Sequence, residues 1–138
     1  MKTRSRVAVV AACCLVLLGG AVVGHAQKAV TELMVKVAFP FSVGDQAFPP
    51  GTYRVTRNPT GLGPLEVAQV GGELKAKVTV VTRLSHEVTP AHDPEAALVF
   101  DKVKDQAFLS EVWMAEQDGY LLRGSADEHQ HLVVRTAK

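Results

Sequence analysis

The sequence predicts an all-β domain that follows an N-terminal signal peptide. The domain is expected to be an antiparallel β-sandwich, or a small barrel, of about seven to eight strands. Apolar and polar residues alternate at a period of two in several segments, as in strands with one buried face. Turn residues separate these segments about every 8–12 positions. We favour the sandwich over the barrel.

The N-terminus has the three parts of a bacterial secretory signal. Residues 1–6 carry three positive charges and no acid, and residues 7–23 are only Val, Ala, Leu, Cys and Gly. The sequence Gly-His-Ala at 24–26 then places small residues where a signal peptidase reads the chain. We therefore predict a signal peptide over 1–26 and a single β-sandwich domain over 27–138, exported to the periplasm or the extracellular space.

Two alternatives keep the protein on a membrane. The apolar run approaches the ~20 residues that span a bilayer, but its late glycines and its exit sequence favour cleavage, which leaves no stable membrane span. The stretch Val10–Cys13 is similar to a lipid-attachment box. A cut there would leave the apolar residues 15–23 on the mature chain, so the lipid-anchored form is the minority interpretation.

Composition limits the chemistry of the mature domain. Both cysteines, Cys13 and Cys14, lie in the signal peptide, so the remaining 112 residues can form no disulfide, thiolate metal site or cysteine nucleophile. Three of the fifteen Lys and Arg residues precede position 7, which leaves twelve against fourteen acids and a net charge of −2. Without a basic face or a high pI, we expect no nucleic-acid partner.

The first strand and hairpin are predicted near the start of the domain. From Leu33 to Val43 every odd position is apolar, which indicates one strand with a buried face. Pro40 cannot donate to a ladder, so this strand is expected at a sheet edge or with a bulge. Pro50-Gly51 fits the centre of a type II turn, and residues 53–57 then return as the second strand of a hairpin.

The rest of the chain follows the same pattern. Gly71-Gly72 and Asp118-Gly119 are turn signals, and the proline-containing stretch 85–95 is expected to be a long loop. Only residues 28–34 have the character of a short helix. Further strands are predicted over residues 65–70, 74–80, 97–103, 107–116, 120–125 and 132–136.

Two blocks of the sequence resemble a known family. Phe39-Pro40-Phe41-Ser42-Val43-Gly44 and the following Pro49-Pro50-Gly51-Thr52-Tyr53 are similar to the opening of an uncharacterised family of small secreted proteins common in Acidobacteria. Leu98-Val99-Phe100, Phe108–Trp113 and Ser125 are similar to the family's second block. The resemblance covers most of residues 35–125. It implies export and a β fold, and it implies no reaction and no functional residue.

The strongest candidate for chemistry is a pair of histidines. His129 and His131 are two residues apart, so in an extended segment both imidazoles project to the same face, as a zinc or copper site needs. Asp127 and Glu128 lie beside them, and the histidines of the long loop, His86 and His92, could approach. The alternative is that these are surface histidines between strands, because the spacing alone supplies no third ligand.

The catalytic candidates are weaker than this pair. The adjacent His92-Asp93 would usually point apart, and no Gly-x-Ser-x-Gly elbow surrounds Ser85 or Ser110. Carboxylate pairs for glycoside hydrolysis could be drawn from Glu66, Glu73, Asp101 and Glu111, as in any acidic β protein. We therefore predict no catalytic residue and no cofactor.

A last candidate is an apolar ligand site. Trp113 and Phe108 lie on a segment that is apolar on both faces, which is typical of a covered central strand. It could instead mean that Trp113, Phe108 and Phe100 line a cavity for an apolar ligand.

These observations favour a non-enzymatic, exported binding or structural module. An envelope or extracellular protein could join it through an edge strand. The alternatives are a small carrier of an apolar ligand and a histidine-based metal-binding protein.

Overall fold

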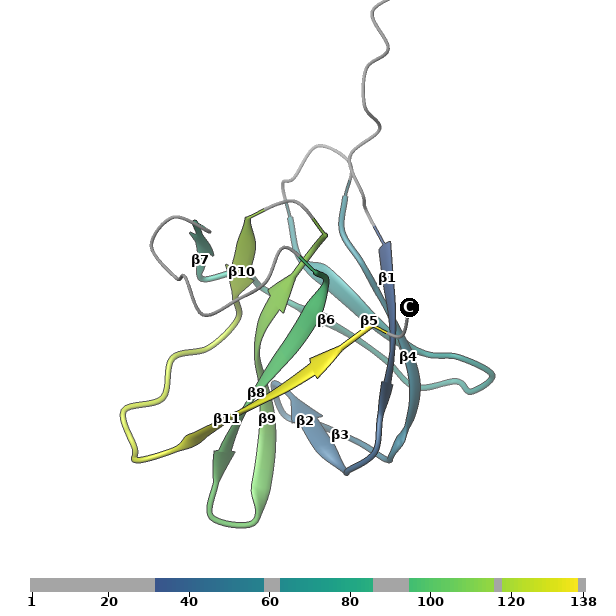
Figure 1. The fold of residues 1–138 in the computed structure, drawn as a ribbon. Coiled ribbons are helices and arrows are strands. Elements are labelled where there is room, and N and C mark those ends of the chain that lie inside the picture. Colours follow the sequence, from purple (N-terminus) through teal and green to yellow (C-terminus); the bar gives the residue numbers. More distant parts are fainter. Residues whose placement is uncertain (1–31, 59–62, 86–94, 116–117, 137–138) are drawn as a thin grey trace, which may run out of the picture.

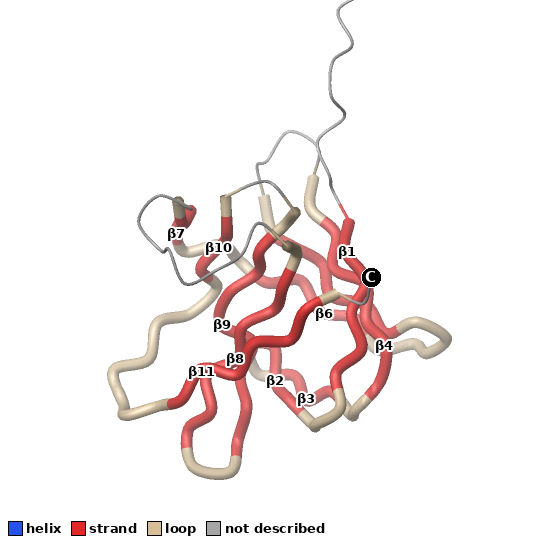
Figure 2. The backbone as a smooth tube through the Cα atoms, in the orientation of Figure 1, coloured by secondary structure: helices blue, strands red, loops and turns tan. Residues whose placement is uncertain are grey.

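Two β-sheets lie face to face in the computed structural model, which describes residues 32–58, 63–85, 95–115 and 118–136 (Figure 1). The described residues form eleven strands and no helix (Figure 2). The sheets are separate and do not close into a barrel. The predicted all-β, sandwich-like fold is therefore confirmed.

The first sheet has four antiparallel strands, and the second has five in one row plus a short hairpin. The first sheet has the order β1 (Glu32–Val37), β4 (Gly51–Thr56), β5 (Leu65–Gln69) and β6 (Lys75–Val78). The row of the second sheet has the order β11 (Gln130–Arg135), β8 (Ala97–Val103), β9 (Gln106–Trp113), β10 (Gly119–Leu121) and β7 (Thr82–Leu84). The hairpin of β2 (Phe41–Val43) and β3 (Gln46–Phe48) joins this sheet through one parallel bridge between β2 and β9.

The segment predicted as one strand from Leu33 to Val43 is divided between the two sheets. Its odd positions are buried at both ends, as the alternation predicted. The ladder stops before Pro40, which has no N–H to donate, and the chain passes from edge strand β1 in the first sheet to β2 in the second. Residues 32–34 belong to β1, so the helix predicted over 28–34 is wrong there; residues 28–31 lie outside the described part.

The predicted hairpin partners do pair, but the predicted turn is wrong. β1 runs antiparallel to β4, with Leu33 opposite Val55. Gly51 is the first residue of β4 and its φ is not positive, so the type II turn at Pro50-Gly51 does not form. In the sequence, the β2–β3 hairpin comes between β1 and β4. Gly44, with a φ of 57°, lies in the turn of this hairpin.

The later strands lie close to their predicted ranges. β8 spans residues 97–103 as expected, and β9 pairs antiparallel with β10 across the Asp118-Gly119 signal. Strands outnumber the prediction because β2, β3 and β7 have three residues each, too short to show a period. The long loop predicted over 85–95 falls almost wholly outside the described residues.

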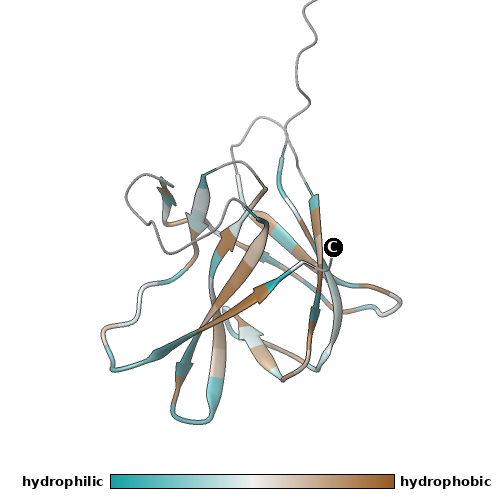
Figure 3. Ribbon diagram, in the orientation of Figure 1, coloured by the Kyte–Doolittle hydropathy of each residue, from teal (hydrophilic) through white to brown (hydrophobic). Residues whose placement is uncertain are grey.

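The core lies between the two sheets. Buried side chains of β1, β4 and β5 meet those of β8 and β9, and Phe41 packs edge-on against both Tyr53 and Phe100. A second buried group, Ala97, Val99 and Trp113, lies on the other face of the second sheet. β8 and β9 are thus covered on both faces near Trp113, as predicted for a central strand. Figure 3 shows the hydrophobic residues concentrated along β8, β9 and the middle of β11.

Candidate metal centre

Two histidines and an aspartate meet on the outer face of the second sheet, the face turned away from the core. Asp101 lies on β8 and follows the core residue Phe100, so its side chain projects outward. His131 lies directly opposite Asp101 on the neighbouring strand β11. His129 lies two residues earlier, and the two imidazole centroids are 4.8 Å apart. The predicted convergence of the two histidines is present in the structure.

The donor atoms have the spacing of ligands around one ion. Asp101 Oδ1 is 3.8 Å from His129 Nε2 and 3.4 Å from His131 Nδ1. One donor atom from each residue lies within 4.8 Å of the others. Zinc bonds of about 2.0–2.2 Å at the tetrahedral angle place neighbouring donors about 3.3–3.6 Å apart. Small side-chain adjustments would therefore bring all three onto one ion.

The Asp101 carboxylate is buried, and one of its oxygens has no hydrogen-bond partner in the described part of the chain. Its side chain is 3% exposed, and Oδ1 has no hydrogen-bond partner among the described residues. A buried carboxylate oxygen without a donor is costly, because water no longer solvates it. The groups that face it in the cluster are the two imidazole nitrogens. This oxygen is therefore aimed at the point where a cation would complete the cluster.

The hydrogen bond on the far side of the His129 ring fixes its tautomer. Nδ1 lies 2.7 Å from the carbonyl oxygen of Asp127, and only a protonated Nδ1 can donate to that carbonyl. In the neutral ring the lone pair is then on Nε2, the nitrogen that faces Asp101. Histidines that bind metals usually donate their other ring N–H to a carbonyl or carboxylate in this way. His129 is thus oriented as a metal ligand.

A β-bulge lies beside the cluster and shapes the surface there. The β8–β9 register shifts between Val99 and Phe100, which leaves Ser110 of β9 without an opposite residue. The Ser110 hydroxyl donates to the carbonyl of Val99 at 3.1 Å, and the Ser110 carbonyl accepts the amide of Leu122 at 2.7 Å. The bulge therefore ties the chain after β10 to the sheet next to Asp101. Bulges often occur next to functional sites, where they re-aim side chains.

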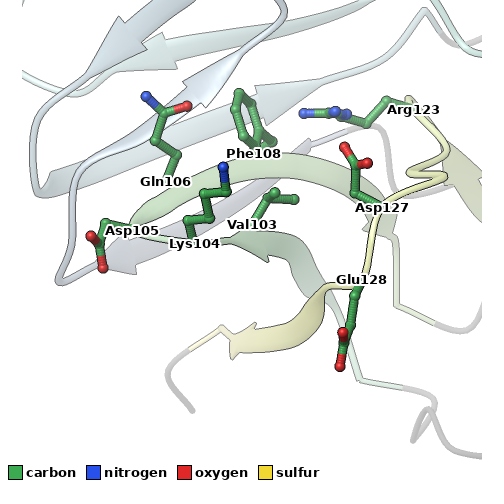
Figure 4. Close-up of a pocket in the computed structure, with 8 residues that line it drawn as sticks. All are labelled: Val103, Lys104, Asp105, Gln106, Phe108, Arg123, Asp127 and Glu128. Atoms are coloured by element: carbon green, nitrogen blue, oxygen red, sulfur yellow. The ribbon is translucent and has the colours of Figure 1, made fainter.

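Three hollows lie in or beside the cluster, and the one of about 290 Å³ is lined by His129 together with Lys102, Lys104, Glu128 and Gln130. One of about 200 Å³ contains the cluster itself and is lined by Asp101, Ser110, Glu111, Leu121, Arg123, Gly124, Ser125, His129 and His131. A wider, open hollow of about 860 Å³ is lined by Val103, Lys104, Asp105, Gln106, Phe108, Arg123, Asp127 and Glu128 (Figure 4). Arg123 lines the last two, and its guanidinium carbon lies 4.2 Å from the centroid of the Phe108 ring.

The third ligand differs from those considered in the sequence. Asp127 contributes its backbone carbonyl, and Glu128 lines the wider hollow. His86 and His92 lie outside the described residues. In the sequence analysis, Asp101 was only one of four carboxylates considered for glycoside hydrolysis. The signal that could have identified it is a charge at the end of the apolar run 97–100, because a charge in a buried strand needs a partner. Within the described ranges, no other group of three His, Cys, Asp or Glu donors converges.

The three aromatic residues proposed for an apolar ligand do not face one space. Phe100 is in the core between the sheets, whereas Trp113 belongs to the buried group on the outer face. Phe108 is on the outer face under Arg123. Ser110, which was considered as a nucleophile, is 1% exposed, and its hydroxyl donates a hydrogen bond to the carbonyl of Val99.

Comparisons with protein-family models, curated proteins and solved structures find no match to this chain. In the described part, no helix is long and apolar enough to cross a membrane. Function is therefore inferred from the geometry of the cluster.

Proposed function

We propose that this protein is an exported, non-enzymatic metal-binding module that holds one Zn²⁺ ion with Asp101, His129 and His131. The observation that carries the proposal is the buried Asp101 Oδ1, which has no hydrogen bond and faces two imidazole nitrogens. The predicted signal peptide over 1–26 places this module in the periplasm or extracellular space.

The donor set and its spacing favour zinc. Two imidazoles and a carboxylate suit zinc, copper, nickel and non-haem iron. Octahedral sites with bonds of about 2.1 Å bring neighbouring donors to about 3.0 Å, closer than the 3.4 and 3.8 Å found here. The 3.4 Å spacing lies within the range of a tetrahedral site, the common geometry of zinc, and the 3.8 Å spacing would need a small movement of the His129 ring.

An ion pair without metal is a poorer explanation of the same cluster. The separation of 3.8 Å between His129 Nε2 and Asp101 Oδ1 is too long for a hydrogen bond. The bond from His129 Nδ1 to the Asp127 carbonyl also leaves a lone pair on Nε2 in the neutral ring. With the ring neutral, two acceptors face each other, and a bound cation satisfies both.

Metal content of the mature protein tests the proposal. After incubation with Zn²⁺ and dialysis, native mass spectrometry is expected to show one zinc per chain, and the double variant His129→Ala/His131→Ala is expected to show none. Gln130→Ala is the matched control, because it changes the same segment without removing a donor. A wild-type protein that retains no metal, or a double variant that retains as much as the wild type, would contradict the proposal. In a parallel incubation with equal amounts of Zn²⁺ and Cu²⁺, preferential retention of Cu²⁺ would change the metal and keep the site.

A further inference from the structure

We infer that the bound metal takes a small oxyanion, a carboxylate or a phosphate, as its remaining ligand, and that Arg123 holds the other side of that anion. This inference rests on the proposed metal site. It assigns a ligand class to the hollow of about 200 Å³ beside the cluster.

The coordination number leaves room for a further ligand. Zinc sites with three protein ligands keep a fourth position open for water or a substrate. Two of the donors, Asp101 and His131, come from the paired strands β8 and β11, and His129 comes from the segment just before β11. The hollow that contains these donors is also lined by Arg123 and Ser125, so polar groups surround the space that an open position would face.

Arg123 is placed beside the cluster. Phe108 is the ladder partner of Asp101 on β9, so His131, Asp101 and Phe108 form one row across three neighbouring strands. The Arg123 guanidinium lies over the Phe108 ring at 4.2 Å, a cation–π contact that holds it at the end of this row. Strands are about 4.8 Å apart, so the charge stands about two strand spacings from His131. The ion would lie between His131 and Asp101, so a metal–oxygen bond, the anion and a hydrogen bond to the guanidinium together can span the remaining distance.

The guanidinium of Arg123 has the chemistry that an anion needs. In Figure 4 the Asp127 carboxylate points toward Arg123 from the side of the wider hollow, and the smaller hollow, which Arg123 also lines, is where the anion would lie. Arginine presents its donors as a planar fork that matches carboxylate and phosphate oxygens.

The charges that line the smaller hollow make anion binding depend on the metal. Without an ion, the smaller hollow carries the charges of Asp101 and Glu111 against Arg123, a negative balance that disfavours an anion. The Glu111 carboxylate also accepts the indole N–H of Trp113 at 2.7 Å. A divalent ion turns this balance positive. Anion binding should therefore depend on the metal.

The test uses the mature protein loaded with Co²⁺, whose visible absorption reports its ligands. Metal stoichiometry is measured first by native mass spectrometry. Acetate and inorganic phosphate are then titrated separately into the metal-loaded and metal-free protein, with absorption and calorimetry as readouts. The variants are Arg123→Gln and the matched control Arg83→Gln, because Arg83 also lies over an aromatic ring, that of Tyr120, away from the cluster.

We expect at least one of the two anions to shift the Co²⁺ spectrum and to bind only the metal-loaded protein. Its affinity should fall about tenfold or more in Arg123→Gln, as for the loss of a charge-assisted contact, and stay unchanged in Arg83→Gln. The tighter of the two anions identifies the class. If metal binds and neither anion does, or if Arg123→Gln binds as well as the wild type, the inference is wrong and the metal site stands. If no metal binds, both fail.

Discussion

Tyr53 shows how one buried side chain makes stability depend on pH. Its ring packs edge-on against Phe41 and Phe48 in the core, and its hydroxyl donates to the carbonyl of Pro49. Burial raises the pKa of Tyr53 above its ordinary value of 10.0. As pH rises through 10, the unfolded chain loses this proton before the folded one does. The contribution of Tyr53 to stability is therefore intact below about pH 10 and is lost above it.

The variant Tyr53→Phe tests this dependence. At pH 7 it should lower the free energy of unfolding by about 0.5–1.5 kcal/mol, because it removes one hydrogen bond. Between pH 9 and 11 it should lose less stability than the wild type, so the two curves should converge. Urea unfolding across this pH range measures both effects. Parallel curves for the two proteins would show that Tyr53 does not cause the alkaline loss.

Residue spacing predicted two of the three side chains in the candidate metal centre. The His-x-His pair was visible because side chains two apart share a face of an extended segment, and His129 and His131 do lie together. Asp101 was not predictable as their partner, because its position opposite His131 depends on which strands pair. β8 and β11 are neighbours in space but are separated in sequence by β9 and β10, and no local pattern encodes that order.

At the scale of elements, the close approach of β9 and β10 depends on a glycine. Gly119 lies opposite Trp113 in the ladder. A Cβ built at Gly119 would lie 2.6 Å from the Cδ2 atom of the indole, well inside contact distance. The indole thus occupies the space that a side chain at position 119 would need.

We therefore expect Gly119→Ala to lower the free energy of unfolding by about 1–3 kcal/mol through overpacking. Trp113 is the sole tryptophan of the chain, so its fluorescence maximum and near-ultraviolet circular dichroism report the displacement of the ring directly. Gly124→Ala is the matched control, because a Cβ there meets nothing within 4 Å. Equal urea midpoints for the two variants would mean that the indole moves aside without cost.

The period of two predicted strand positions better than it predicted their connections. A continuous apolar run located β8, which is covered on both faces, and alternation located β1 and β6, whose burial alternates along the strand. It could not show that the chain changes sheets at Pro40, since the odd positions stay buried on both sides of the change. It also missed the bulge at Ser110, which lets Phe108 and Trp113 share the outer face although they are five residues apart.

For the molecule as a whole, the proposed ion would work as a cross-link. It would join Asp101 of β8 to His131 of β11 and to His129 in the segment before β11. In the sequence, His129 is 28 positions from Asp101 and His131 is 30 positions from it. The predicted mature chain has no cysteine, so no disulfide can tie its strands together. A ligand that binds only the folded state stabilises it by about 2.7 kcal/mol at 100 times its dissociation constant.

Zinc should therefore raise the urea midpoint of the wild-type protein, and Asp101→Asn should lose most of that rise. The asparagine keeps the shape of the side chain and removes the charge that the ion neutralises. In EDTA the variant should be at least as stable as the wild type, because Asp101 Oδ1 is buried there without a hydrogen bond. Unfolding with and without zinc, followed by the fluorescence of Trp113, measures both differences.

Asp105→Asn, at the turn between β8 and β9, is the control and should keep the full zinc effect. An Asp101→Asn protein that gains as much stability from zinc as the wild type would place the ion elsewhere. An Asp101→Asn protein that is less stable than the wild type in EDTA would mean that the carboxylate stabilises the fold rather than binding the metal.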